Sequence, residues 1–275
     1  MTGNNSVFSA KMYTMHRLYS LSLLFALLIS LSSNAIGPKP AKEYYEIKVY
    51  HFANKDQELT LDNYLSKAYL PALHKKGFKN IGVFKPVAND TAADKKIYVF
   101  ISASSLEKLS DIPGQLEKDS AYKKAAGSYL DAAFDQPPYT RTETILLSSF
   151  RLAPKMILPA LKSSKADRIY ELRSYESATD KLYEQKVKMF NEGGEIALFK
   201  RLVFNAIFYA DVISGSRMPN LMYMTSFENK TERDAHWKTF GADPEWKQLS
   251  GLAEYAHTVI KADIILMQAA EYSDL

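Results

Sequence analysis

Alternating polar and apolar residues predict a β-strand near the start of each half of the chain, at residues 44–52 and 168–176. A long amphipathic helical pattern follows each strand, then two β-rich stretches, a second helical region and an apolar closing strand. In the first half these segments are 61–76, 81–87, 96–102, 106–133 and 142–150. In the second half they are 180–202, 204–213, 221–227, 231–255 and 258–268.

The same motifs occur twice in the same order, which predicts an internal duplication. The motif YEIKVY at residues 45–50 returns as YELRSY at 170–175, an offset of 125 residues. Three further pairs keep the order with a drifting offset: IYVF (97–100) with MYMT (222–225), DSAYK (119–123) with DPEWK (243–247), and ILL (145–147) with ILM (265–267). We predict two homologous repeats at 42–150 and 167–275, joined by a proline-containing linker at 151–166.

Each repeat has the element order βαββαβ, which is that of the ferredoxin-like unit. Such a unit covers one face of an antiparallel sheet with helices, and its bare face must also be buried. Two units in one chain can achieve this by packing sheet against sheet. The predicted fold class is therefore α+β, with tandem ferredoxin-like βαββαβ repeats packed sheet to sheet as an α/β barrel. A monomer is sufficient for this arrangement, and a homodimer through edge-strand pairing is the alternative.

The first strand of each repeat carries a polar face whose orientation bears on function. In both strands an apolar set of residues alternates with a Glu-(Lys/Arg)-Tyr set. We expect the apolar set to face the helices and the polar set to face the opposing sheet. The members of the polar set are Glu46, Lys48, Tyr50, Glu171, Arg173 and Tyr175.

Charged residues between two sheets are costly unless they are paired, which leaves two interpretations of the polar set. In one, its members form structural salt bridges that hold the halves in register. In the other they line a ligand pocket, where Arg173 binds an anionic or carbonyl group and Glu171 or Tyr175 transfers a proton. Arg217, in a polar loop, is a second candidate contact for an anionic ligand. His236 belongs either to an aromatic cluster or, as an acid–base group, to the barrel mouth.

The repeats differ where the first long helix ends. Repeat one has Gly77 there, a residue suited to a left-handed helix cap. Repeat two has Val203 at the matching position, and a β-branched residue adopts that conformation only with strain. The pattern therefore does not place the exit of this helix.

Composition excludes several classes of protein. The chain has 275 residues, 47% hydrophobic and 24% charged, which excludes disorder and a disulfide-stapled miniprotein. With no cysteine, thiol nucleophiles and cysteine-ligated metal centres are excluded as well. The histidines are dispersed and no phosphate-binding glycine motif occurs, so we predict neither a metal nor a cofactor, with an axial histidine for haem left open. A net charge of +4 is too small and too scattered to predict nucleic-acid binding.

Residues 1–35 have the three parts of a secretory signal peptide. A basic segment precedes a fourteen-residue apolar run at 18–31, and small residues follow it. The run is shorter than the roughly 20 residues that span a bilayer, and an uncleaved anchor is the alternative. We predict a periplasmic or secreted protein that starts at Met1, Met12 or Met15 and does not bind membranes after cleavage.

Four stretches of the second half resemble the NIPSNAP family: RIYELRSYE (168–176), GSRMPNLMYMTSFE (215–228), RDAHW (233–237) and DPEW (243–246). The resemblance covers essentially the whole second half, and the first half looks like a diverged copy. It implies the fold of the dimeric α/β-barrel proteins. Eukaryotic members are associated with mitochondria, vesicle traffic and mitophagy signalling, and the predicted export argues against those roles here. The wider superfamily includes cofactor-free monooxygenases and haem enzymes, which keeps catalysis open by analogy of fold.

Three functions are compatible with these features. The first is the binding of a small organic molecule between the two sheets. The second is a cofactor-free oxygenase or isomerase that uses the same pocket, with Arg173 stabilising an oxyanion and Tyr175 or His236 transferring a proton. The third is a non-catalytic protein-interaction module whose barrel interior is only packed. A binder or enzyme needs a solvent-connected cavity of roughly 300–1,000 Å³.

Overall fold

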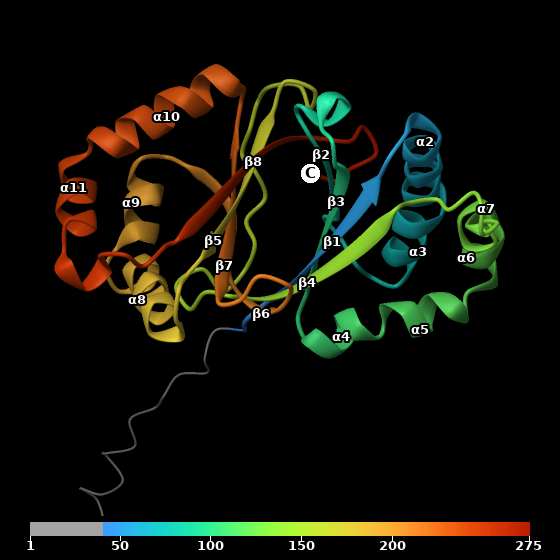
Figure 1. Cartoon of the computed structure of the whole chain (residues 1–275), viewed down its shortest axis with the longest axis horizontal. Helices are drawn as coiled ribbons and strands as arrows, with labels where there is room; N and C mark the ends of the chain where they lie inside the picture. The colour runs from blue at the N-terminus through green and yellow to red at the C-terminus, as the bar shows by residue number, and fades with distance from the viewer. Residues whose placement is uncertain (1–40) are drawn as a thin grey trace, which may run out of the picture. The chain divides into compact units, whose positions relative to one another are not determined.

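Eight antiparallel strands close into a barrel in the computed structural model of the protein, which describes residues 41–275 (Figure 1). The order of the strands around the barrel is β1-β3-β2-β8-β5-β7-β6-β4. The strands of the first half are β1 (Tyr44–Phe52), β2 (Gly82–Pro86), β3 (Lys95–Ala103) and β4 (Arg141–Ser149). Those of the second half are β5 (Ile169–Glu176), β6 (Asn205–Ser214), β7 (Asn220–Phe227) and β8 (Lys261–Ala269).

Helices cover the outside of the barrel, and each half supplies its own set (Figure 1). The first half has α2 (Lys55–Tyr64), a π-helical turn (Leu65–Tyr69), α3 (Leu70–Lys75), α4 (Leu106–Ser110), α5 (Ile112–Glu117), α6 (Ser120–Ala125) and α7 (Gly127–Leu130), with a 3₁₀ turn at Asn89–Thr91. The second half has α8 (Asp180–Asn191), α9 (Glu195–Arg201), α10 (Lys230–Ala242) and α11 (Pro244–Ser250), with a 3₁₀ turn at Ala253–Tyr255. Within residues 41–275, no helix combines the length and the apolar character needed to cross a bilayer.

The predicted duplication determines how the barrel closes. Strands β4-β1-β3-β2 form the sheet of the first half, and β8-β5-β7-β6 repeat that order in the second. The halves join where β2 pairs with β8 and where β4 pairs with β6. The prediction of two ferredoxin-like units closing an α/β barrel is confirmed. The repeat boundaries at 42–150, 151–166 and 167–275 stay predictions, and the predicted signal peptide lies outside the described residues.

The strand register corrects one part of the repeat alignment. Val49 of β1 pairs with Tyr98 of β3, and the matching residue of the second half, Ser174, pairs with Met222 of β7. Tyr98 is therefore equivalent to Met222, whereas the motif alignment matched it with Tyr223. A shift of one residue in a strand moves every side chain to the opposite face of the sheet.

The faces of β1 and β5 are also the reverse of those we predicted. Tyr45, Ile47 and Val49 pack with Tyr170 and Leu172 inside the barrel. The polar set therefore points outward, beneath the helices. The physical reason is that both faces of each sheet are buried, so alternation does not decide between them, and in the second half Arg233 and Trp237 of α10 supply hydrogen bonds to Glu171 on the helix side.

The asparagine and aspartate caps explain several helix starts. Asn54 accepts the backbone N–H of Gln57, which starts α2 several residues before the predicted helix. Asp119 and Asp243 cap α6 and α11, so the matched motifs DSAYK and DPEWK have the same role in both halves. Val203 follows α9 with a φ of 58°, the left-handed conformation that Gly77 adopts after α3 with a φ of 91°.

Candidate functional site

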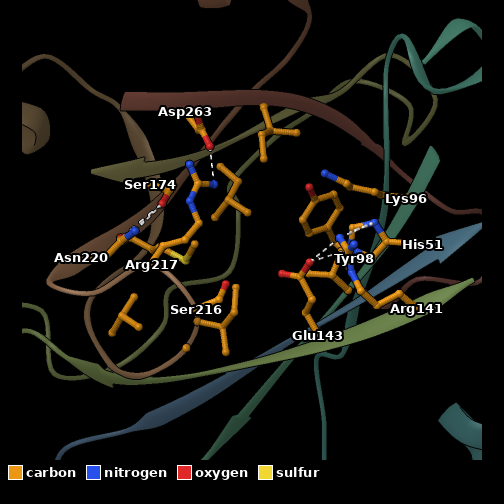
Figure 2. A pocket seen from close by; sticks show the side chains of 17 residues that line it. His51, Lys96, Tyr98, Arg141, Glu143, Ser174, Ser216, Arg217, Asn220 and Asp263 are labelled. Atoms are coloured by element: carbon orange, nitrogen blue, oxygen red, sulfur yellow. Dashed lines mark hydrogen bonds and ion pairs between the residues drawn. The ribbon is translucent and has the colours of Figure 1, made fainter. Parts of the chain in front are cut away.

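A cavity of about 280 Å³ lies within the barrel, and both halves line it (Figure 2). Six apolar side chains contribute to its lining. They are Val49, Ile145, Leu172, Val212, Met222 and Ile265. Polar and charged side chains gather at one end of the strands, where β1 ends at Phe52 and β5 at Glu176. This combination of an apolar interior with a few polar groups is typical of small-molecule sites.

The first half contributes a polar wall that crosses three neighbouring strands. Arg141 of β4, His51 of β1 and Lys96 of β3 lie side by side in the strand register. The Nδ1 atom of His51 lies 2.6 Å from Asp94, and its Nε2 atom lies 3.0 Å from Glu143. Arg141 also donates to Glu143 at 2.8 Å. The 2% exposed His51 ring is therefore oriented by two carboxylates.

The second half contributes Arg217 from the loop between β6 and β7. Its guanidinium lies 2.5 Å from both Glu176 and Asp263, so it links the loop to β5 and β8. Below it, Asn220 donates to the Ser174 hydroxyl at 2.8 Å. The mouth of the cavity is thus bordered by ion pairs on both sides (Figure 2).

Electrostatics at this mouth favour specific protonation states. Burial raises the pKa of Tyr98, and the carboxylates of Glu143 and Asp94 add to that increase. Tyr98 therefore stays a neutral hydrogen-bond donor at physiological pH. Burial alone would raise the pKa of Asp94, but donation from His51 and Lys96 holds it below its ordinary value.

The predicted residues of the second half do not line this cavity. Glu171 is fully buried under α10, where its carboxylate accepts N–H donors from Arg173 (2.6 Å), Arg233 (2.6 and 3.0 Å) and Trp237 (2.8 Å). Arg173 stacks 3.5 Å above the Trp237 ring and donates to the Tyr175 hydroxyl at 2.9 Å. The structure thus brings Glu171, Arg173 and Tyr175 together, but in a saturated network that fastens α10 to the sheet.

The predicted residues of the first half lie in the equivalent helix-covered layer. Tyr50 is fully buried in the cluster formed with α2, α3 and the later helices. Glu46 is 8% exposed, and burial raises its pKa, with partial compensation from Lys48. These three residues are also absent from the cavity lining.

Of the other two candidates, Arg217 is at the cavity and His236 is not. Arg217 lines the mouth, and its role in ligand binding stays a prediction. His236 packs against Phe204 and Phe227 on the helix side, with its Nδ1 atom 2.9 Å from the Glu232 carbonyl. It therefore belongs to the aromatic cluster, as one of our two interpretations stated.

Sequence reasoning missed most of the polar cavity residues. They are His51, Lys96, Tyr98, Arg141, Glu143, Ser174, Asn220 and Asp263. One signal was available: His51 ends the alternating set of β1 that we assigned to the helix side. Within residues 41–275, no three histidine, aspartate or glutamate side chains form a group that could hold a metal ion.

The fold and the cavity define the class of protein, a duplicated ferredoxin-like chain closed as an α/β barrel around a small internal site. Its second half carries a NIPSNAP domain, because residues 170–274 match the sequence model of the NIPSNAP family. Among curated proteins, none matches the chain.

Several solved structures resemble the protein in fold. A proposed monooxygenase from Lactobacillus acidophilus NCFM aligns over 83% of this chain and 94% of its own, at 13% identity and a TM-score of 0.54. One from Fusobacterium nucleatum aligns over 84% and 93%, at 7% identity and a TM-score of 0.55. An uncharacterised NIPSNAP-like domain protein from Burkholderia xenovorans aligns over 39% and 90%, at 16% identity and a TM-score of 0.36. The first two similarities indicate a shared fold and carry no information about activity.

Proposed function

We propose that the protein binds a small organic molecule in the cavity between its two sheets. The observation that carries this proposal is the cavity itself: about 280 Å³ of space lined by apolar side chains together with a set of polar and charged groups. A barrel interior that served only for packing would be filled at close to crystalline density. The proposal keeps the predicted function and transfers the ligand contacts from Glu171, Arg173 and Tyr175 to the residues that line the cavity.

The test is a binding titration with 1-naphthol, a fluorescent neutral probe of one fused ring system. We expect a dissociation constant of about 1 mM or lower for the wild type, because burying a ligand of this size supplies at least the binding free energy that this constant requires. Val49→Phe fills the cavity and should abolish binding. Ile264→Phe is the matched control, since Ile264 lies on the outer face of β8 with 47% exposure.

Circular dichroism verifies that each variant is folded, and Met222→Phe replaces Val49→Phe if the latter does not fold. Absence of 1-naphthol binding by the wild type would overturn the proposal and favour the interaction-module alternative. Equal binding by the wild type and by both cavity-filled variants would place the probe elsewhere and overturn it as well.

A cofactor-free oxygenase is the second candidate function. The observation that favours it is a neutral phenol, Tyr98, next to the cavity, in a fold shared with two structures described as proposed monooxygenases. Such an enzyme would take all four electrons that reduce O₂ from its substrate: a CH₂ group becomes C=O with one oxygen atom, and the two hydrogens leave as water with the other. The test is an oxygen electrode with 2-tetralone, an enolisable ketone of naphthalene size. For an enzyme we expect oxygen uptake that requires the protein and that Val49→Phe abolishes. Oxygen uptake no faster than in the protein-free control would favour a binder.

A further inference from the structure

The polar groups of the cavity are distributed unequally between the two halves. Lys96 and Tyr98 are two residues apart on β3, so their side chains leave the same face of the strand and enter the same space. Their equivalents on β7 are Asn220 and Met222. The cavity therefore has a cation and a phenol on one wall, and an amide and a thioether on the other.

The three cations that line the cavity differ in how firmly they are paired. Arg217 is held by two carboxylates, Glu176 and Asp263, at 2.5 Å. Arg141 pairs with Glu143 at 2.8 Å, and its side chain is 60% exposed. The acid partner of Lys96 is Asp94, at 3.2 Å.

Asp94 is 52% exposed and does not line the cavity. Ion pairs with an exposed partner are weak because water screens them. The Lys96 ammonium, whose side chain is 30% exposed, can therefore exchange Asp94 for an oxyanion inside the cavity.

Tyr98 adds a hydrogen-bond donor beside this ammonium. Figure 2 shows the Tyr98 hydroxyl and the Lys96 amine on the same side of the cavity, across from Arg217 and Asp263. The phenol is 7% exposed and neutral, so it donates its proton to an acceptor and does not repel a negative charge. A hydrogen bond to a charged acceptor is roughly twice as strong as one between neutral groups.

We propose that the cavity selects an apolar ring or short chain that ends in an oxyanion, a carboxylate or phenolate, anchored by the Lys96 ammonium and the Tyr98 hydroxyl. This inference rests on the proposed function and specifies its ligand class. The apolar body then lies against Val49, which neighbours Tyr98 across the strands, and against Leu172 and Ile265 of the second half. Because only the first half carries the anchor, the ligand binds in one orientation.

The experiment compares three probes with the same ring and different charge at neutral pH: 1-naphthoate, 1-naphthol and 1-naphthylmethylammonium. We expect the wild type to bind the anion at least about tenfold more tightly than the cation. Lys96→Met removes the charge and keeps the length of the side chain. It should lower the affinity for 1-naphthoate about tenfold and change the affinity for 1-naphthol by no more than about twofold.

Tyr98→Phe removes only the hydroxyl, and it should lower the affinities for 1-naphthoate and for 1-naphthol about fivefold each. The matched control is Lys261→Met at the opposite side of the mouth, where the ammonium lies 3.9 Å from both Glu176 and Asp263. This control should leave the affinities for all three probes unchanged.

The outcomes separate this inference from the function on which it rests. If 1-naphthol binds and Val49→Phe removes that binding, the proposed function stands whatever the charge preference. Equal affinity for the anion and the cation, or an unchanged 1-naphthoate affinity in Lys96→Met, then overturns the oxyanion anchor alone. If none of the probes binds, the proposed function fails and the ligand class fails with it.

Discussion

Val203 and Gly77 have the same left-handed backbone conformation at equivalent positions after a helix, although one is a β-branched residue and the other a glycine. Each lies between a helix and a strand, β6 or β2, that pairs with the sheet of the other half. Each has a positive φ, 58° for Val203 and 91° for Gly77. In both halves the next residue donates its N–H to a carbonyl five positions back, Phe204 to Phe199 and Phe78 to Leu73. This is the Schellman arrangement, in which glycine is preferred because a Cβ atom is strained in the left-handed region.

We predict that Val203→Gly stabilises the protein by about 0.5–1 kcal/mol, because relief of strain exceeds the added freedom of the unfolded chain. Little packing is lost, since Val203 is 70% exposed. The reverse change, Gly77→Val, should cost about 1–2 kcal/mol through backbone strain alone, because a Cβ atom at Gly77 would meet nothing within 4 Å. Urea denaturation measures both. A lower midpoint for Val203→Gly would show that the valine is unstrained.

At the scale of elements, a buried carboxylate adds hydrogen bonds between α10 and the sheet to the aromatic packing of this helix. Glu171 of β5 accepts four N–H donors, three of them from Arg233 and Trp237 on α10. The first half has no counterpart, since Leu109 of α4 stands where Arg233 does, four residues after the helix cap in each half. Glu46 therefore shares the position of Glu171 and lacks those donors among the described residues.

We expect Glu171→Gln to destabilise the protein by about 3–5 kcal/mol, because a broken buried pair leaves Arg173 without its counter-charge and Arg233 with only the exposed Asp234. Thermal unfolding with and without the substitution measures this. Glu46→Gln is the matched control at the same strand position, and it should not lower stability at neutral pH. A similar loss in both variants would mean that the cost arises from the amide and not from the network.

The effect of the control substitution Glu46→Gln on stability should depend on pH in a defined direction. Burial raises the pKa of Glu46 above its ordinary 4.5, so the folded state binds the proton more tightly than the unfolded state. The carboxyl group therefore stabilises the fold below its unfolded pKa, and this contribution is lost as pH rises through the raised folded pKa. Glu46→Gln should gain stability relative to wild type at neutral pH and lose that advantage near pH 4. A pH-independent difference would contradict the shift.

At the scale of the whole molecule, neither half forms the barrel without the other. The sheets share two strand pairings, β2 with β8 and β4 with β6. The end of the chain adds a further link, because Ala270 donates to Val83 and Asp274 donates to Ile81. Leu275 is 3% exposed within the barrel cluster. The barrel thus closes within one chain, while the choice between monomer and homodimer stays a prediction.

We predict that residues 41–275 unfold as one cooperative unit. Both tryptophans, Trp237 and Trp246, lie in the second half, so their fluorescence reports on that half alone. Leu73→Ala in the first half should cost about 2–5 kcal/mol through the cavity that it creates. The fluorescence midpoint should shift as far as the circular dichroism midpoint. An unshifted tryptophan transition, with biphasic dichroism, would show that the halves unfold separately.

The number and order of the strands, and the closure of two repeated sheets into a barrel, could be predicted from the amino-acid sequence. Those features depend on local periodicity and on repeated motifs, which can be recognised directly in the amino-acid sequence. The bounds of β1, for example, were predicted as the structure has them. The sequence did not determine which face of each strand is inside. Alternation separates Ile47 and Val49 from Glu46 and Lys48, but it does not say which set meets the helices when both faces are buried.

Contacts between residues far apart in the sequence determine which face is inside. Glu171 faces outward because Arg233 and Trp237, some sixty residues later in the chain, supply its hydrogen bonds there. The site followed from the same choice, because the residues of the inner face, among them Lys96 and Tyr98, then became the lining of the cavity. A buried charge lies where distant residues can neutralise it, and the spacing of residues along one strand does not encode that position.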